Sequence, residues 1–159
     1  MLLWDYEMKP ELPLIEAMDA VQRLSTAVEA LAWSYSTMRP PVEDEATRSL
    51  IERGLVACRA ALAAGSGEVE REDGFLEEVD EVYEETEEEG TAHLLSAVTD
   101  CFDSADGGLT ADGLYTILSY CYEGIVDREE IDEVTPEAER SNARCVEAIR
   151  FQKDLLRRA

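Results

Sequence analysis

Apolar residues recur at intervals of three and four positions along most of this chain, which is the spacing that gathers them on one face of an α-helix. Between residues 13 and 37 this apolar stripe alternates with charged side chains, so the pattern predicts one long amphipathic helix. Arg39-Pro40-Pro41 ends it, and a second helix is expected from about residue 42 to residue 64. Two such helices joined by a short proline turn predict an antiparallel hairpin.

The second half of the chain repeats the pattern in three further stretches. We expect helices from Thr91 to about Phe102, after Thr110, and after Thr135-Pro136, where threonine is a favourable N-cap and proline suits the first helical position. No alternating apolar runs flank an Asn-Gly or Asp-Gly turn, the pattern typical of a β-hairpin. The sequence therefore predicts an all-α fold, a single-domain bundle of about five to six helices with acidic connecting segments.

A chain of this size can bury one sizeable hydrophobic core. With 159 residues, of which 45% are hydrophobic, we expect a single helical domain over residues 1–159. Gly65-Ser66-Gly67 is typical of a linker, and the acidic segment 66–90 is the part of the domain that could be flexible. No apolar run approaches the roughly 20 residues that span a bilayer, and the first residues lack a basic signal-peptide region, so a cytoplasmic protein is expected.

The four cysteines lie far apart in the sequence, without a Cys-x-x-Cys pair, and the chain has a single histidine, His93. A zinc site needs several such thiolate and imidazole ligands at close spacing, so none is expected here. Each cysteine falls within an apolar periodic stretch. We therefore predict reduced, buried thiols, as is usual in a cytoplasmic protein.

Acidity excludes several classes of partner. The chain has 37 acidic residues against 14 basic ones, a formal net charge of −23. It has too few cations to replace the counterions around phosphates, so nucleic acid is not an expected partner, and anionic membranes are disfavoured for the same reason. A basic protein surface is the natural electrostatic complement. The same charge also favours solubility, which is the simpler interpretation of it.

Most of this charge is concentrated in two blocks. The first acidic block, residues 68–89, has 13 acidic residues and one basic, and the second acidic block, residues 127–139, has seven and one. Both can be solvated faces, or they can form one surface that presents carboxylates to a basic groove, with Phe75 and Tyr83 as aromatic anchors. The candidate partner-binding residues are Glu77, Glu78, Glu81, Tyr83, Glu84, Glu85 and Glu88 in the first block and Asp127, Glu129, Glu130, Asp132 and Glu133 in the second.

No motif identifies a reaction. The sequence lacks a nucleophile elbow and a phosphate-binding loop, and no Glu-x-x-His pair of the kind that holds two metal ions in helical bundles is present. The segment 102–110 is similar to a calcium loop, but its spacing puts Ala105 and Leu114 at ligand positions. We therefore expect no enzyme activity and no cofactor, with a carboxylate–metal hydrolase as the weakest of the alternatives.

A small, acidic, all-helical domain without a catalytic motif resembles the acidic all-α immunity proteins of bacterial toxin–immunity systems. The resemblance lies in general character over the whole chain, because these proteins share no signature motif. It implies a protein-binding module that occludes the basic active site of a cognate toxin, for instance a nuclease, by competing with the negative charge of the substrate. The alternative is a self-associating helical module with a structural or regulatory role, such as a homodimer through the first two helices.

Overall fold

The computed structural model describes residues 1–102 and 107–159, and the all-α prediction is confirmed over these ranges. Within them no residue lies in a β-strand, and no helix combines the length and apolarity needed to cross a membrane. In chain order the elements are α1 (Leu3–Met8), the 3-10 helix η1 (Lys9–Glu11), α2 (Leu12–Glu16), α3 (Ala20–Ser36), α4 (Glu45–Ala63), α5 (Phe75–Glu85), α6 (Thr91–Cys101), α7 (Ala111–Arg128), α8 (Pro136–Arg140) and α9 (Ala143–Arg158).

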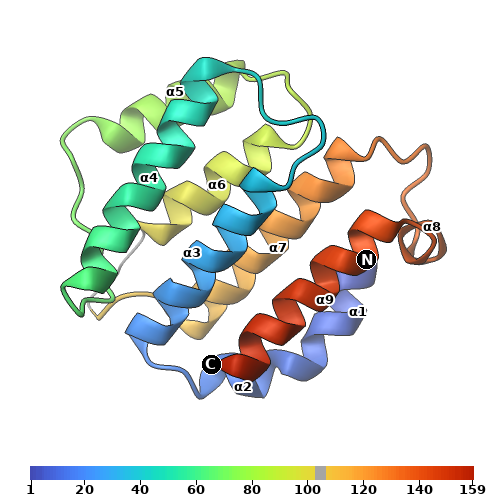
Figure 1. Cartoon of the computed structure of the whole chain (residues 1–159), viewed down its shortest axis with the longest axis horizontal. Coiled ribbons are helices and arrows are strands. Elements are labelled where there is room, and N and C mark those ends of the chain that lie inside the picture. Colours follow the sequence, from blue (N-terminus) through green and yellow to red (C-terminus); the bar gives the residue numbers. More distant parts are fainter. Residues whose placement is uncertain (103–106) are drawn as a thin grey trace.

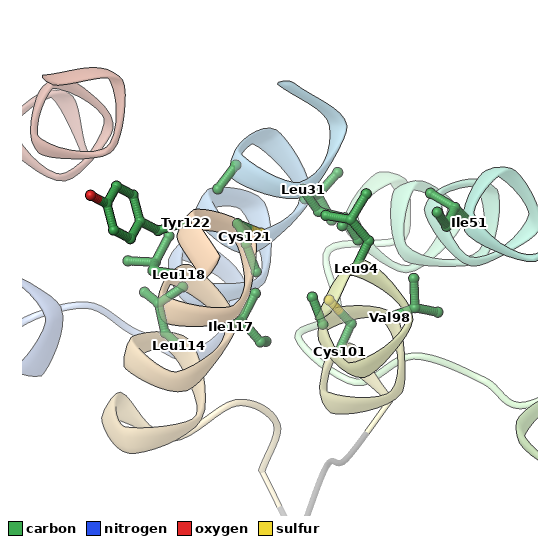
Figure 2. Packing of buried hydrophobic residues seen from close by; sticks show 14 of the residues in the cluster. Leu31, Ile51, Leu94, Val98, Cys101, Leu114, Ile117, Leu118, Cys121 and Tyr122 are labelled. Carbon is green, nitrogen blue, oxygen red and sulfur yellow. The ribbon is translucent and has the colours of Figure 1, made fainter. Parts of the chain in front are cut away.

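Helices α3, α6 and α7 pack against one another at the centre of the bundle (Figure 1). Helices α4 and α5 cover one side of this centre, while α1, α2 and α9 cover the other. Figure 2 shows the side chains that fill the space between them, including Leu31 from α3, Ile51 from α4, Leu94 from α6 and Ile117 from α7. The acidic helix α5 and the basic helix α9 therefore lie on opposite flanks of one core.

The number of helices was underestimated because short elements interrupt the expected long ones. The expected helix over residues 13–37 is wrong: α2 ends at Glu16 and α3 begins at Ala20. Asp19 restarts the helix, because its carboxylate accepts the Gln22 N–H at 2.8 Å while the Gln22 side chain accepts the Asp19 N–H at 2.9 Å. This reciprocal capping box satisfies backbone donors at the new N-terminus.

Three other boundaries depend on capping residues. The expected final helix is split into α8 and α9, because the Asn142 side chain accepts the N–H groups of Arg144 and Cys145 and opens a new helix. Helix α4 begins at Glu45 instead of residue 42, since the Asp44 carboxylate caps Thr47 at 2.9 Å. The predicted cap of α7 is confirmed, with Thr110 accepting the Gly113 N–H.

The first helix, α1, was not predicted, and buried polar contacts hold it in place. The Glu139 carboxylate, which is fully buried, accepts the Leu3 N–H at 3.1 Å and the Tyr122 hydroxyl at 2.6 Å. The Trp4 indole N–H donates to Gln152 at 2.7 Å. Burial, and after it the Glu139 carboxylate, raises the pKa of Tyr122 well above its usual range. The hydroxyl therefore stays protonated and acts as a hydrogen-bond donor to Glu139.

All four cysteines are free and buried, as predicted. Cys121 on α7 and Cys145 at the start of α9 have no solvent exposure. Burial disfavours the thiolate and raises the pKa of Cys121 to about 12 and that of Cys145 to about 11. These two thiols are therefore protonated at neutral pH and pack as small apolar groups.

Two glycines allow α6 and α7 to approach closely. Gly90 precedes α6 with φ of 84°, and a Cβ atom there would collide with the carbonyl oxygen of Gly124 in the last turns of α7. A Cβ atom on Gly124 would in turn lie 3.0 Å from the Gly90 carbonyl oxygen. The backbones of the two elements meet without intervening side chains, and this contact sets where the first acidic block returns to the core.

Gly90 can be compared with Gly74, which precedes α5 with φ of 82° but has open space around its Cα. Gly74→Ala should cost about 1–2 kcal/mol, the strain of a left-handed backbone at a non-glycine residue. Gly90→Ala should cost about 1–3 kcal/mol more, because it adds a steric collision to the same strain. Urea denaturation of both variants measures the difference, and equal losses would contradict the close contact.

Candidate functional site

Helix α5 displays the carboxylates of the first acidic block on its outer face. Phe75 and Val79 are buried against the core, and Leu76 and Val82 are half-buried beside them. The Phe75 ring lies 5.1 Å from that of Phe102, beside α6. Because a helix has 3.6 residues per turn, the positions between these apolar residues face outward. The exposed residues there include the predicted Glu77, Glu78, Glu81, Tyr83, Glu84 and Glu85.

Most of the exposed carboxylates of α5 have no cationic neighbour. Glu78 pairs with Arg53 of α4 at 3.0 Å, but both side chains are more than one-third exposed and the pair contributes little. Across the described ranges no hydrogen bond or ion pair involves the carboxylates of Glu77, Glu81, Glu84 and Glu85. We call these four residues the open α5 face. Its charge is balanced only by solvent and salt.

Glu88 differs from these four, because its carboxylate is used inside the molecule. It accepts the N–H groups of Glu43 and Asp44 at 2.9–3.1 Å, just before α4, and forms an ion pair of 2.9 Å with Arg128 at the end of α7. The Glu88 side chain is only 21% exposed. It therefore joins three segments of the fold and has little surface left for a partner.

Arg128 is the basic residue of the second acidic block, and its side chain is 7% exposed. Besides Glu88, its guanidinium donates to the carbonyl oxygens of Pro40, Pro41 and Glu89 at 2.7–3.0 Å. This contact was not anticipated from the sequence. A single cation inside a run of acids was the signal that could have pointed to it, since such a cation has carboxylates and carbonyls to bind on several sides.

The ends of the two acidic blocks meet at one end of the bundle. In Figure 1 the connection after α5 and the end of α7 lie at the same upper corner. There Glu89 lines a shallow pocket of about 330 Å³ together with Asp127, Glu130 and Asp132. Of the predicted second-block residues, these three are therefore brought next to the end of the first block.

The remaining second-block residues are placed differently. Glu129 is half-buried, and its carboxylate accepts the side-chain N–H of Asn142 at 3.1 Å, which supports the residue that caps α9. Glu133 is exposed in the connection between α7 and α8 and does not line the pocket with Glu89. The candidate residues thus comprise the open α5 face with Tyr83, a carboxylate group at the end of α7, and structural members such as Glu88 and Glu129.

His93, the single histidine of the chain, lies beside this carboxylate group. Its Nε2 is 2.8 Å from Asp127, and its Nδ1 is 3.4 Å from Glu123 on the same face of α7. Burial raises the pKa of Glu123 although the histidine opposes this. The contacts join α6 to α7 through three partly exposed polar side chains. Asp127 is therefore shared between an internal contact and the surface, with its side chain 44% exposed.

The described ranges contain no group of three or more histidine, cysteine, aspartate or glutamate side chains arranged to hold a metal ion. The segment 102–110, which is similar to a calcium loop, includes residues 103–106, and these lie outside the described ranges. On its described side, the Gly107 N–H donates to the Glu68 carboxylate at 2.9 Å.

The hydrogen bonds of Glu88 lead to a prediction about how the stability of the fold depends on pH. Burial tends to raise the pKa of Glu88, but the N–H groups of Asp44 and Glu43 and the Arg128 guanidinium outweigh it, so this pKa is lower than in the unfolded chain. A carboxyl group of this kind stabilises the fold above its unfolded pKa and loses that effect as pH falls through its folded pKa. Glu88→Gln should therefore cost about 1–2 kcal/mol at pH 7 and progressively less below about pH 4.

Urea denaturation at a series of pH values measures this effect. Glu85→Gln is the matched control, because Glu85 is exposed at the end of α5 with no partner in the described ranges, and its replacement should cost nothing at any pH. A loss for Glu88→Gln that does not change between pH 7 and pH 3 would contradict the assignment.

Comparison with protein-family models, curated proteins and solved structures found no match for this chain. Its function is therefore inferred from the arrangement of its own residues. The features that bear on it are the open α5 face with Tyr83 and the carboxylates gathered at the end of α7.

Proposed function

We propose that this chain is an acidic protein-binding module whose partner presents a basic surface. The observation that carries the proposal is the open α5 face, four carboxylates without a cationic partner in the described ranges. Glu77 and Glu81, and again Glu81 and Glu85, are four residues apart on one helix. Each such like-charged pair costs a few tenths of a kcal/mol. A cationic surface placed against this face relieves the repulsion. Binding a basic partner therefore offsets the free energy that this repulsion costs the folded protein.

Tyr83 is an exposed aromatic residue on another flank of α5, about 100° around the helix from Glu84. Its side chain is 44% exposed, on a helix otherwise covered with carboxylates. Exposed tyrosines are enriched among the residues that contribute most to protein–protein binding, because the ring buries a large apolar area and the hydroxyl keeps a hydrogen bond. The partner would pair arginine or lysine side chains with Glu77, Glu81 and Glu84, and would reach around α5 past Glu84 to cover the Tyr83 ring.

The specific form that we propose is an immunity protein that occludes the basic active site of a cognate bacterial toxin. An active site that binds an anionic substrate holds cationic side chains at fixed positions. Carboxylates spaced along a rigid helix can pair with these cations in place of the substrate. Asp127, Glu130 and Asp132 at the end of α7 would extend the surface. Glu88 and Glu129 would act as supports, since their carboxylates are engaged internally.

Self-association through the first two expected helices is the second hypothesis, and the packing gives it less support. The apolar stripes that suggested it belong to α3 and α4, and their residues Leu24, Leu31, Ile51 and Leu55 are buried in the core. On α4 the large apolar side chain left exposed is Val56. An apolar face wide enough for a stable dimer is therefore not left over on these helices.

The proposal is tested by changing Glu77, Glu81 and Glu84 together to glutamine. The partner is first isolated from a lysate of the source organism as a basic protein retained at low salt and released at high salt. We expect the triple variant to bind this purified partner at least tenfold more weakly at low salt, a loss of about 1.4 kcal/mol or more. The same variant should be at least as stable as the wild type, because the like-charge repulsion is removed.

A matched control changes Glu16, Glu29 and Asp112 to their amides, which alters the net charge equally at exposed positions outside α5. This control should bind within about twofold of the wild type, since long-range attraction is screened beyond roughly 8 Å at physiological salt. The immunity form further requires that the chain inhibit the partner's activity in competition with its substrate. Equal binding by the two triple variants would reject the α5 surface, and recovery of this chain alone would favour self-association.

A further inference from the structure

The flank of the bundle opposite α5 has the opposite charge. Residues 140–159, which include α9, have six of the 14 basic residues and two acidic ones. Figure 1 shows α9 beside α1, separated from α4 and α5 by the central helices. A pocket of about 370 Å³ lies on this flank, lined by residues of α1, α8 and α9. It is a local cationic site in a chain of net charge −23.

The pocket has an apolar lining and a basic rim. Leu3 of α1 and Ile149 of α9 are 3% and 6% exposed, and Val146 is half-buried between the same two helices. Arg140 and Arg150 belong to the lining and are exposed. Three of the nine lining residues are apolar and six are charged, and the volume falls within the range of about 300–1,000 Å³ typical of small-molecule sites.

The charges at the rim are not all neutralised within the fold. Lys153 pairs with Glu7, and Arg157 pairs with Glu11, so these two cations are already occupied. Arg140 and Arg150 have no ion pair or hydrogen bond to any side chain in the described ranges. Asp154 also lines the pocket, with a carboxylate that is unpaired there. Two guanidinium groups against one carboxylate leave the rim positive.

We propose that this pocket binds an organic monoanion with a short apolar chain. A guanidinium group binds a carboxylate through parallel N–H donors, and Arg140 and Arg150 supply two such groups beside the apolar lining of Leu3, Val146 and Ile149. The volume of about 370 Å³ suits a medium-chain carboxylate. A polyanion is disfavoured, because the two guanidinium groups of Arg140 and Arg150 against the Asp154 carboxylate leave a single net positive charge at the rim. This site is independent of the proposed function, since it shares no residue with the open α5 face.

Isothermal titration of the full chain with decanoate tests the proposal. We expect saturable binding of one decanoate per chain, and at least tenfold weaker binding to the double variant Arg140→Gln, Arg150→Gln. The control double variant Arg39→Gln, Arg59→Gln changes the net charge equally at exposed positions outside the pocket and should bind within twofold of the wild type. Because Arg140 and Arg150 have no internal partner in the described ranges, their replacement should leave thermal stability unchanged.

Two further ligands separate the contributions of charge and chain. Decanamide keeps the hydrocarbon but lacks the anion, and sulfate has charge without hydrocarbon, so both should bind at least tenfold more weakly than decanoate. A third variant, Val146→Lys, fills the apolar lining while adding positive charge, and should abolish decanoate binding. The proposal is overturned if the wild type shows no saturable binding, if the Arg140/Arg150 variant binds as the wild type does, or if sulfate binds as well as decanoate.

Discussion

The contacts of the Arg128 guanidinium hold together the end of the molecule on which the acidic surface depends. Five N–H donors in a fixed plane allow one arginine to bind several acceptors at once, and Arg128 reaches the carbonyl groups of Pro40, Pro41 and Glu89 as well as the Glu88 carboxylate. The turn after α3, the connection after α5 and the end of α7 are thereby joined. Glu88 strengthens the same junction by accepting two N–H groups before α4. A lysine could not replace this arrangement, because its ammonium group is a single point of donation.

The few basic residues within the acidic blocks serve structure, and this explains why so many acids are left unpaired. Arg71 is the basic residue of the first block, and it donates to the Phe102 carbonyl oxygen at 2.9 Å instead of neutralising its acidic neighbours. Arg128 is used in the same way in the second block. The carboxylates of the open α5 face therefore repel one another in the free protein. This repulsion costs stability, and none of these four exposed carboxylates takes part in the packing of the core.

The core also separates two surfaces of opposite sign. Helices α3, α6 and α7 lie between the acidic flank of α5 and the basic flank of α9, so the two sets of charges do not neutralise each other (Figure 1). At physiological salt, charges further apart than roughly 8 Å are largely screened. The two proposed binding sites, for a basic protein at α5 and for a small organic anion at α9, are therefore electrostatically separate.

Sequence alone was sufficient for features that depend on neighbouring residues. The helices that begin at Thr91 and after Thr110 were predicted, and Thr110 caps α7 as expected, because helix periodicity and caps involve positions only three or four apart. The breaks at Asp19 and Asn142 were missed, since the apolar spacing continues across both.

Tertiary structure decided the rest. Helix α1 is held by Glu139, 136 residues beyond Leu3. Glu88 and the exposed Glu84 look alike in sequence, but the partners of Glu88 lie 40 or more residues away. Which carboxylates are open to a partner is a property of the folded surface, because only folding brings distant donors within hydrogen-bond distance.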